Sequence, residues 1–273
     1  MDNVKILSLQ FTPIKADKTA NLDKVKTLIS NTKEKTFDLI VLPEFFDTGF
    51  NLSNKEFIKY AECEDSSVVL KELAQIAKQY NSYIHCGSII FKHEDKCFNR
   101  AYLLDRNGEI VSKYDKIHLF DYFGGNEGGY TTAGEKYVVA ETDFGKIGFA
   151  TCFDLRFADM FSTLCKLGAE LFVVPAAWSV INKAPETYKT QYLKNWQMIT
   201  CARAYDNVAY IVTSNEVGDV RPMFTGLGNS MIVDFEGNVL ANAKGEETAI
   251  SARLDFSALR KARQIFPIDN LIK

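Results

Sequence analysis

The chain has 273 residues, of which 47% are hydrophobic and 25% are charged. These fractions are typical of a soluble globular protein and exclude a disordered or fibrous chain. The 32 lysine and arginine residues nearly balance 35 aspartate and glutamate residues, for a net charge of −3. Because the chain carries no excess of basic residues, we expect no nucleic-acid partner.

No pattern in the sequence predicts export or insertion into a membrane. The first residues lead directly into a strand-like pattern, without the basic and apolar regions of a signal peptide. The most apolar run, residues 171–180, is too short to span a bilayer and contains Pro175. Six cysteines without a CxxC pair do not indicate a disulfide framework. We therefore expect a cytoplasmic protein with reduced thiols and no membrane partner.

The first half of the chain alternates predicted strands with predicted helices. Apolar residues at spacings of three and four, such as Leu22, Val25 and Ile29, indicate an amphipathic helix. The pair Asn107-Gly108 is typical of a tight hairpin turn. In chain order, the patterns predict a strand over residues 4–12, a helix over 20–33, a strand over 37–42, a helix over 66–80, and strands over 83–91, 98–105 and 109–113.

The second half continues in the same way. Strands are predicted over residues 146–151, 170–174, 208–214, 230–234, 239–242 and 248–254, and helices over 155–167, 187–206 and the tail. No repeat or linker interrupts the pattern, so we expect a single domain over residues 1–273. Many strands mixed with covering helices predict a layered α/β sandwich, and the hairpin signals indicate sheets that are not purely parallel.

Three polar residues lie at predicted strand ends, each amid apolar sequence. Glu44 lies in DLIVLPEFF, Lys116 in SKYDKIHLF and Cys152 in KIGFATCFDLRF. In open α/β folds, functional sites gather at the carboxyl ends of strands, where loops converge. Taken singly, each residue also has a structural interpretation: a solvated loop carboxylate, a surface lysine and an inert buried thiol.

Cys152 is the strongest candidate nucleophile among the six cysteines. Its predicted place between a strand and a helix would bring the sulfur close to a helix N-terminus, which stabilises a thiolate. The small residues Ala150 and Thr151 before it allow a sharp turn and close approach of a substrate. We interpret the others as small buried hydrophobes: Cys63, Cys86, Cys97, Cys165 and Cys201.

The three histidines do not indicate a metal site, because they lack paired spacing. His85 lies in an apolar strand and is interpreted as a packing residue, whereas His93 lies in a polar loop. His118 follows Lys116 and could support a site there. For acyl transfer, a carboxylate and a lysine are then the remaining candidates to assist Cys152.

The segments LPEFF, KYDKIHLF and GFATCFDLRF, in this order, resemble the three signature segments of the nitrilase superfamily of carbon–nitrogen hydrolases. The resemblance extends through RAYDN and GLGNSMIVDFEGNVLA and covers nearly the whole chain. It implies a four-layer α-β-β-α sandwich with a Glu–Lys–Cys active site. It implies no metal and no organic cofactor.

The resemblance also implies a role for each matched residue. Cys152 would form a thioester with the acyl group, and Glu44 would accept the thiol proton and later activate water. Lys116, with the backbone N–H of Phe153, would stabilise the oxyanion. Many members carry a second glutamate between the Lys and Cys segments, and here NEGGYTTAGEK puts Glu127 at that position. Glu135 is the alternative, and a loop surface charge is the structural interpretation of Glu127.

Within the superfamily, CFDLRF, DYFGGNEGGY and AAWSV are similar to segments of the bacterial omega-amidases, which hydrolyse the terminal amide of 2-oxoglutaramate or 2-oxosuccinamate. This similarity implies that Arg156 faces a substrate carboxylate and that Trp178 forms an aromatic wall. The alternatives are an ion pair of Arg156 with Asp154 or Asp159, and core packing of Trp178.

Nitrilases proper usually carry tryptophan directly after the cysteine, so Phe153 favours an amide over a nitrile substrate. The glycine-rich loop at residues 124–129 would form the pocket rim and could act as a lid.

The family resemblance further implies a homodimer or larger homo-oligomer, with helix 187–206 at the interface. Two other functions stay open at this point. One is an N-carbamoyl amino acid amidohydrolase with the same triad. The other is a non-catalytic binding or redox-thiol protein on the same fold.

Overall fold

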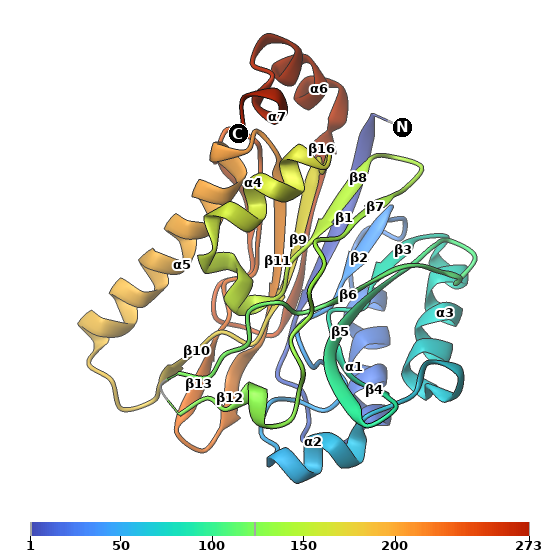
Figure 1. The fold of residues 1–273 in the computed structure, drawn as a ribbon, viewed down its shortest axis with the longest axis vertical. Coiled ribbons are helices and arrows are strands. Elements are labelled where there is room, and N and C mark those ends of the chain that lie inside the picture. Colours follow the sequence, from blue (N-terminus) through green and yellow to red (C-terminus); the bar gives the residue numbers. More distant parts are fainter. Residues whose placement is uncertain (1, 123, 273) are drawn as a thin grey trace.

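The computed structural model describes residues 2–122 and 124–272. Two large sheets lie face to face in the middle of the molecule, and helices cover the outer face of each (Figure 1). One outer layer holds α1 (Lys18–Ser30) and α3 (Val68–Tyr80), and the other holds α4 (Ala158–Lys166) and α5 (Glu186–Asp206). The predicted four-layer α-β-β-α sandwich is therefore confirmed.

The first sheet has the strand order β16-β1-β2-β3-β5-β4, with β6 paired to β5. Its strands are β1 (Asn3–Gln10), β2 (Leu39–Val41), β3 (Tyr83–His85), β4 (Ile89–His93), β5 (Lys96–Leu104), β6 (Ile110–Asp115) and β16 (Thr248–Asp255). β1 pairs parallel with β2 and antiparallel with β16, so the sheet is mixed, as the hairpin signals indicated.

The second sheet has the order β15-β14-β11-β9-β8-β7. Its strands are β7 (Val139–Glu141), β8 (Lys146–Phe149), β9 (Leu171–Ala176), β11 (Tyr210–Asn215), β14 (Met231–Val233) and β15 (Val239–Asn242). The two sheets are joined by direct hydrogen bonds, because Ser8 Oγ donates to Thr213 O at 2.8 Å and Ser214 Oγ donates to Leu9 O at 2.6 Å.

Several elements were not predicted. A small sheet of order β10-β13-β12 lies beside the sandwich, and its strands are short. The elements that were not predicted are β7, β10 (Ser179–Ile181), β12 (Val217–Arg221), β13 (Phe224–Leu227), α2 (Asn54–Tyr60), α7 (Ile268–Leu271) and the 3₁₀ turns Glu64–Ser66, Glu127–Gly129 and Cys152–Arg156. The predicted tail helix is α6 (Phe256–Ile265).

The alternation of side chains along β1 explains how its sheet is buried on both faces. Val4 and Ile6 point into the core between the sheets, whereas Leu7 and Leu9 pack under the helices of the first outer layer. A strand buried on both faces needs apolar residues at nearly every position. The apolar residues of β1 therefore serve both faces, although Ser8 and Gln10 of the same strand are buried polar residues.

One predicted strand, over residues 83–91, is divided in two at Gly87. Gly87 has a φ of +65°, and a Cβ there would lie only 1.9 Å from the carbonyl oxygen of Pro43. Only glycine can combine this backbone conformation with so close an approach. The break holds residues 43–45 against residues 87–88, where the backbone N–H of Phe45 donates to Ser88 Oγ at 3.3 Å. It thereby positions Glu44.

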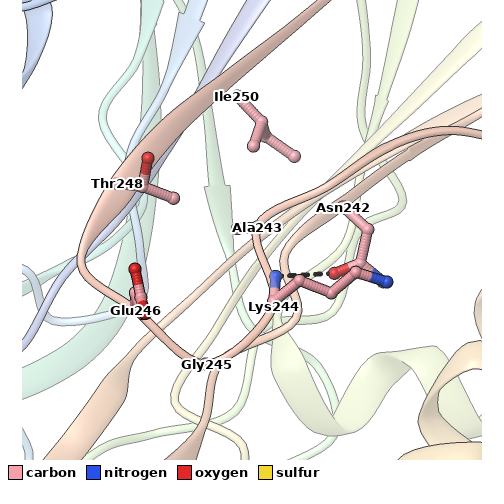
Figure 2. Close-up of a pocket in the computed structure, with 7 residues that line it drawn as sticks. All are labelled: Asn242, Ala243, Lys244, Gly245, Glu246, Thr248 and Ile250. Carbon is pink, nitrogen blue, oxygen red and sulfur yellow. Dashed lines mark hydrogen bonds between the residues drawn. The ribbon is translucent and has the colours of Figure 1, made fainter.

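A shallow hollow at the turn between β15 and β16 is shown in Figure 2. It is lined by residues of one short segment, where the backbone N–H of Lys244 donates to Asn242 Oδ1 at 2.7 Å. This hollow is separate from the cavity that contains Cys152. In the described part of the chain, no helix is both long and apolar enough to cross a membrane.

Candidate active site

The two large sheets bring Glu44, Lys116 and Cys152 to the same end of the sandwich. Glu44 follows β2, Lys116 follows β6 and Cys152 follows β8. Lys116 is 1% exposed, and its Nζ lies 2.9 Å from Glu44 Oε1 and 2.7 Å from Glu127 Oε2. Glu44 and Lys116, which follow strands that are distant in the sequence, thus meet Glu127 in one buried polar cluster.

Glu44 is held at both carboxylate oxygens. Asn99 Nδ2 and Lys116 Nζ donate to Oε1 at 2.8 and 2.9 Å, and the backbone N–H of Ala177 donates to Oε2 at 3.0 Å. With no exposed surface, the carboxylate cannot exchange these partners for water. Its orientation is therefore set before a substrate arrives.

Glu127, rather than Glu135, joins this cluster. Its carboxylate accepts hydrogen bonds from Asn99 Nδ2 at 2.8 Å, Lys116 Nζ at 2.7 Å and the backbone N–H of Phe120 at 2.8 Å. Glu135 is exposed, whereas Glu127 is 1% exposed, so the interpretation of Glu127 as a surface charge is wrong.

Asn99 was missed in the sequence. Its side-chain amide bridges Glu44 and Glu127 from β5, and it is 1% exposed. A polar amide inside the strand segment KCFNRAYLL was the available signal, but a lone asparagine in a strand gives no indication of its partners.

Charge and burial act against each other at Lys116 and Glu127. Burial alone would lower the pKa of Lys116, but the carboxylates of Glu127 and Glu44 outweigh it and hold that pKa well above its usual value. Burial raises the pKa of Glu127, and the nearby Glu44 adds to this effect while Lys116 opposes it. Lys116 therefore stays an ammonium ion that is shared by two acids.

Cys152 lies at a strained turn. Its φ of +51° is in the left-handed region that non-glycine residues rarely occupy. Burial raises the pKa of the Cys152 thiol well above its usual value, the Glu44 carboxylate raises it further, and Lys116 opposes the shift. The predicted stabilisation of a thiolate by a helix N-terminus is wrong, because a 3₁₀ turn follows Cys152 and the α-helix begins only at Ala158.

Asp154 fixes the turn that carries Cys152. Its carboxylate accepts from the Tyr114 hydroxyl at 2.7 Å and from the backbone N–H of Thr151 at 2.8 Å. The ring Nδ1 of His118 lies 2.7 Å from Asp154 Oδ1, and the ring stacks on Phe157. His118 therefore supports the site from behind rather than facing the thiol.

A cavity of about 580 Å³ opens over this cluster, and every predicted substrate-binding residue lines it. Phe153, Arg156 and Trp178 form part of its wall, and Gly124 and Gly125 lie in its rim. Trp178 is 7% exposed, so it also packs in the core against Trp196.

Arg156 has no ion pair with Asp154, whose oxygens already have other partners. In residues 2–122 and 124–272, no carboxylate lies within ion-pair distance of its guanidinium. The guanidinium carbon instead lies 5.2 Å from the centre of the Trp178 ring. The predicted structural ion pair of Arg156 is therefore absent from the described chain. Arg221, which was not predicted, lines the same cavity.

The chain is similar to known proteins over nearly its whole length. The family model "Carbon-nitrogen hydrolase" matches residues 5–264. The omega-amidase NIT2 of Xenopus tropicalis is 30% identical over 98% of this chain and 94% of its own length. The chloroplastic omega-amidase of Arabidopsis thaliana is 31% identical over 98% of this chain and 71% of its own length.

Solved structures show the same fold. Saccharomyces cerevisiae Nit3, described as a member of branch 10 of the nitrilase superfamily, has a TM-score of 0.85 and 26% identity, with 97% of this chain and 95% of that chain covered. A carbon-nitrogen hydrolase from Helicobacter pylori has a TM-score of 0.90 at 21% identity, with 97% and 94% covered.

Proposed function

This chain belongs to the carbon–nitrogen hydrolase family, and we propose that it acts on the terminal amide of a small carboxylate-bearing substrate such as 2-oxoglutaramate. As a family member with omega-amidase relatives, it is a hydrolase of carbon–nitrogen bonds other than peptide bonds. The observation that carries the finer proposal is the buried Glu44–Lys116–Glu127 cluster beside Cys152, in a cavity that also presents Arg156.

In the proposed first half-reaction, Glu44 accepts the Cys152 proton as the sulfur attacks the amide carbon. A base is required because the thiol pKa is raised and the resting sulfur is protonated at neutral pH. Negative charge then develops on the amide oxygen, where the Lys116 ammonium and the Phe153 backbone N–H would stabilise it. Glu44 returns the proton to the nitrogen, the carbon–nitrogen bond breaks, and ammonia leaves.

In the proposed second half-reaction, water hydrolyses the thioester. Glu44 accepts a proton from water as the water oxygen attacks the acyl carbon, and the proton then passes to the departing Cys152 sulfur. The product is the free carboxylic acid. Glu127 holds Lys116 in place through both steps, as its 2.7 Å contact with Nζ supports.

Arg156 is proposed to bind the substrate carboxylate. A guanidinium can bind a carboxylate with two parallel charge-assisted hydrogen bonds. Its lack of an ion-pair partner in the described chain leaves those donors free, and its place in the cavity wall brings them near Cys152. Trp178 and Phe153 would enclose the carbon chain between the amide and the carboxylate.

The test is ammonia release measured in parallel from 2-oxoglutaramate, glutamine, asparagine and N-carbamoyl amino acids. We expect 2-oxoglutaramate to be hydrolysed fastest. Ammonia and CO₂ from N-carbamoyl amino acids, without turnover of 2-oxoglutaramate, would favour the amidohydrolase alternative. No turnover of any substrate by the folded protein would favour a non-catalytic binding or redox-thiol protein.

We also propose a homodimer formed through α5. Tyr188, Met198 and Tyr205 on this helix are 51%, 61% and 65% exposed, and burial of this surface would favour association. Light scattering of the protein as it elutes from a size-exclusion column should give twice the chain mass, and Met198→Lys should shift the protein toward the monomer.

We also propose a reducing, cytoplasmic setting, which the six free thiols support.

A further inference from the structure

Arg221 is a charged residue of the cavity wall that the proposed mechanism does not use. It is the last residue of β12, and a shift of register between Asp219 and Arg221 interrupts the pairing of β12 with β13. Such bulges re-aim side chains. The Arg221 guanidinium carbon lies 4.7 and 4.5 Å from the ring centres of Phe50 and Phe224, and the residue lines the same cavity as Cys152.

The charge of Arg221 is not neutralised in the described part of the chain. Its Nη2 donates to Ser179 Oγ at 2.9 Å, but its buried Nε–H has no acceptor. Glu216 is the buried acid whose charge would act on Arg221, but its carboxyl oxygens have no hydrogen-bond partner. Burial raises the pKa of Glu216 well above its usual value, which weakens the negative charge that it could present to Arg221. Arg221 is therefore a cation of the cavity wall without a hydrogen-bonded carboxylate among the described residues.

Arg156 and Arg221 each contact a residue of one short segment of the cavity wall, residues 178–179. The Trp178 ring contacts Arg156, and the next residue, Ser179, is hydrogen-bonded to Arg221. Both arginines line the cavity of about 580 Å³ that contains Cys152. The cavity in which the amide would bind at Cys152 therefore has two cations in its wall.

We propose that Arg221 selects amides of 2-oxo acids over amides of 2-amino acids, an inference that rests on the proposed function. With the substrate carboxylate on Arg156, the substituent on the neighbouring carbon faces the second cation. A 2-oxo oxygen would accept a hydrogen bond from the part of the Arg221 guanidinium that lines the cavity. A 2-ammonium group at the same place carries no acceptor and is repelled by the guanidinium charge.

The first experiment compares kcat/KM for 2-oxoglutaramate and for glutamine in the wild type and in Arg221→Met. We expect the value for 2-oxoglutaramate to fall at least about tenfold, the usual effect of losing one hydrogen bond to a charged group. The value for glutamine should stay the same or rise. The ratio of kcat/KM for 2-oxoglutaramate to kcat/KM for glutamine should therefore fall at least about tenfold. An equal fall for both substrates would overturn the inference, because it would make Arg221 a structural residue.

Arg221→Lys separates charge from geometry. Lysine keeps the positive charge but lacks the guanidinium fork. It should continue to reject glutamine while recovering only part of the rate with 2-oxoglutaramate. Arg106→Met is the matched control, because Arg106 also lies 5.3 Å from an aromatic ring centre but outside the cavity. Its substrate ratio should equal that of the wild type.

A binding measurement keeps this inference distinct from the proposed function. Calorimetry with 2-oxoglutarate and with glutamate needs no turnover. We expect the affinity for 2-oxoglutarate, and not that for glutamate, to fall about tenfold or more in Arg221→Met. This result without amide hydrolysis would support the role of Arg221 and contradict the proposed reaction. Amide hydrolysis with unchanged ratios and affinities in Arg221→Met would overturn the role of Arg221 alone.

Discussion

The base and the wall of the cavity differ in how their charges are balanced. At the base, Lys116 contacts two carboxylates, and Asn99 and backbone N–H groups occupy the remaining carboxylate oxygens. In the wall, Arg156 and Arg221 have no carboxylate partner within the described residues. The charges at the base thus have partners without a ligand, whereas we propose that the charges in the wall find theirs on the substrate. The difference separates the groups suited to chemistry from those suited to selecting the substrate.

The largest effect should come from Cys152→Ala. The variant removes the only atom that can form the proposed thioester, so amide hydrolysis should fall to the background rate. The fold should be retained, since a small side chain at a half-buried position is replaced by a smaller one. Ammonia release tests the loss of activity, and thermal unfolding tests whether the fold is retained. Cys201→Ala, which removes another thiol, is the control. Turnover retained in Cys152→Ala would falsify the assignment of the nucleophile.

The next largest effect should come from the charges at the base. Glu44→Gln and Lys116→Ala should each lower kcat at least about 10²-fold, the scale for a positioned base or an oxyanion donor. Lys116→Ala should also lower the free energy of unfolding by about 3–5 kcal/mol, because it leaves two buried carboxylates without their cation. Steady-state kinetics and urea unfolding test both. Near-normal kcat in either folded variant would remove that residue from the mechanism.

The sequence predicted the parts of the site that follow strong strand patterns. Glu44 and Cys152 lie at the ends of apolar runs, and Lys116 directly follows β6. Asn99 and Arg221 could not be predicted, because their importance depends on contacts between distant segments. Their roles, like those of the predicted residues, stay predictions until they are tested.

The missing parts of the fold have a similar physical origin. β10 has only three residues, which is too short to show a period of two in the sequence. The chain after Cys152 forms a 3₁₀ turn before its α-helix, because Asp154 is drawn back to the Thr151 N–H and to Tyr114. Such a turn has the same local composition as the start of a helix.

A smaller effect, and one limited to a class of substrate, should come from Arg156. Arg156→Ala should lower kcat/KM for 2-oxoglutaramate by about one to two decades, the scale for one or two hydrogen bonds to a charged group. A neutral amide without the carboxylate should be hydrolysed at nearly the wild-type rate. Arg156→Lys should recover part of the loss, because it keeps the charge without the fork. An equal loss for neutral and anionic amides would show that Arg156 supports the turn rather than the substrate.

The smallest effect should be on stability, and it tests the contrast between base and wall most directly. Arg156 is exposed and its described contacts include a ring 5.2 Å away but no carboxylate. A cation beside an aromatic ring at an exposed site contributes about 0.5–1 kcal/mol. Arg156→Ala should therefore change the free energy of unfolding by less than about 1 kcal/mol. Urea unfolding of Arg156→Ala beside Lys116→Ala, in the same buffer, measures the difference. If the two variants lose the same stability, the Arg156 charge has a partner in the folded protein. The contrast between the paired charges at the base and the unpaired charges in the wall would then be wrong.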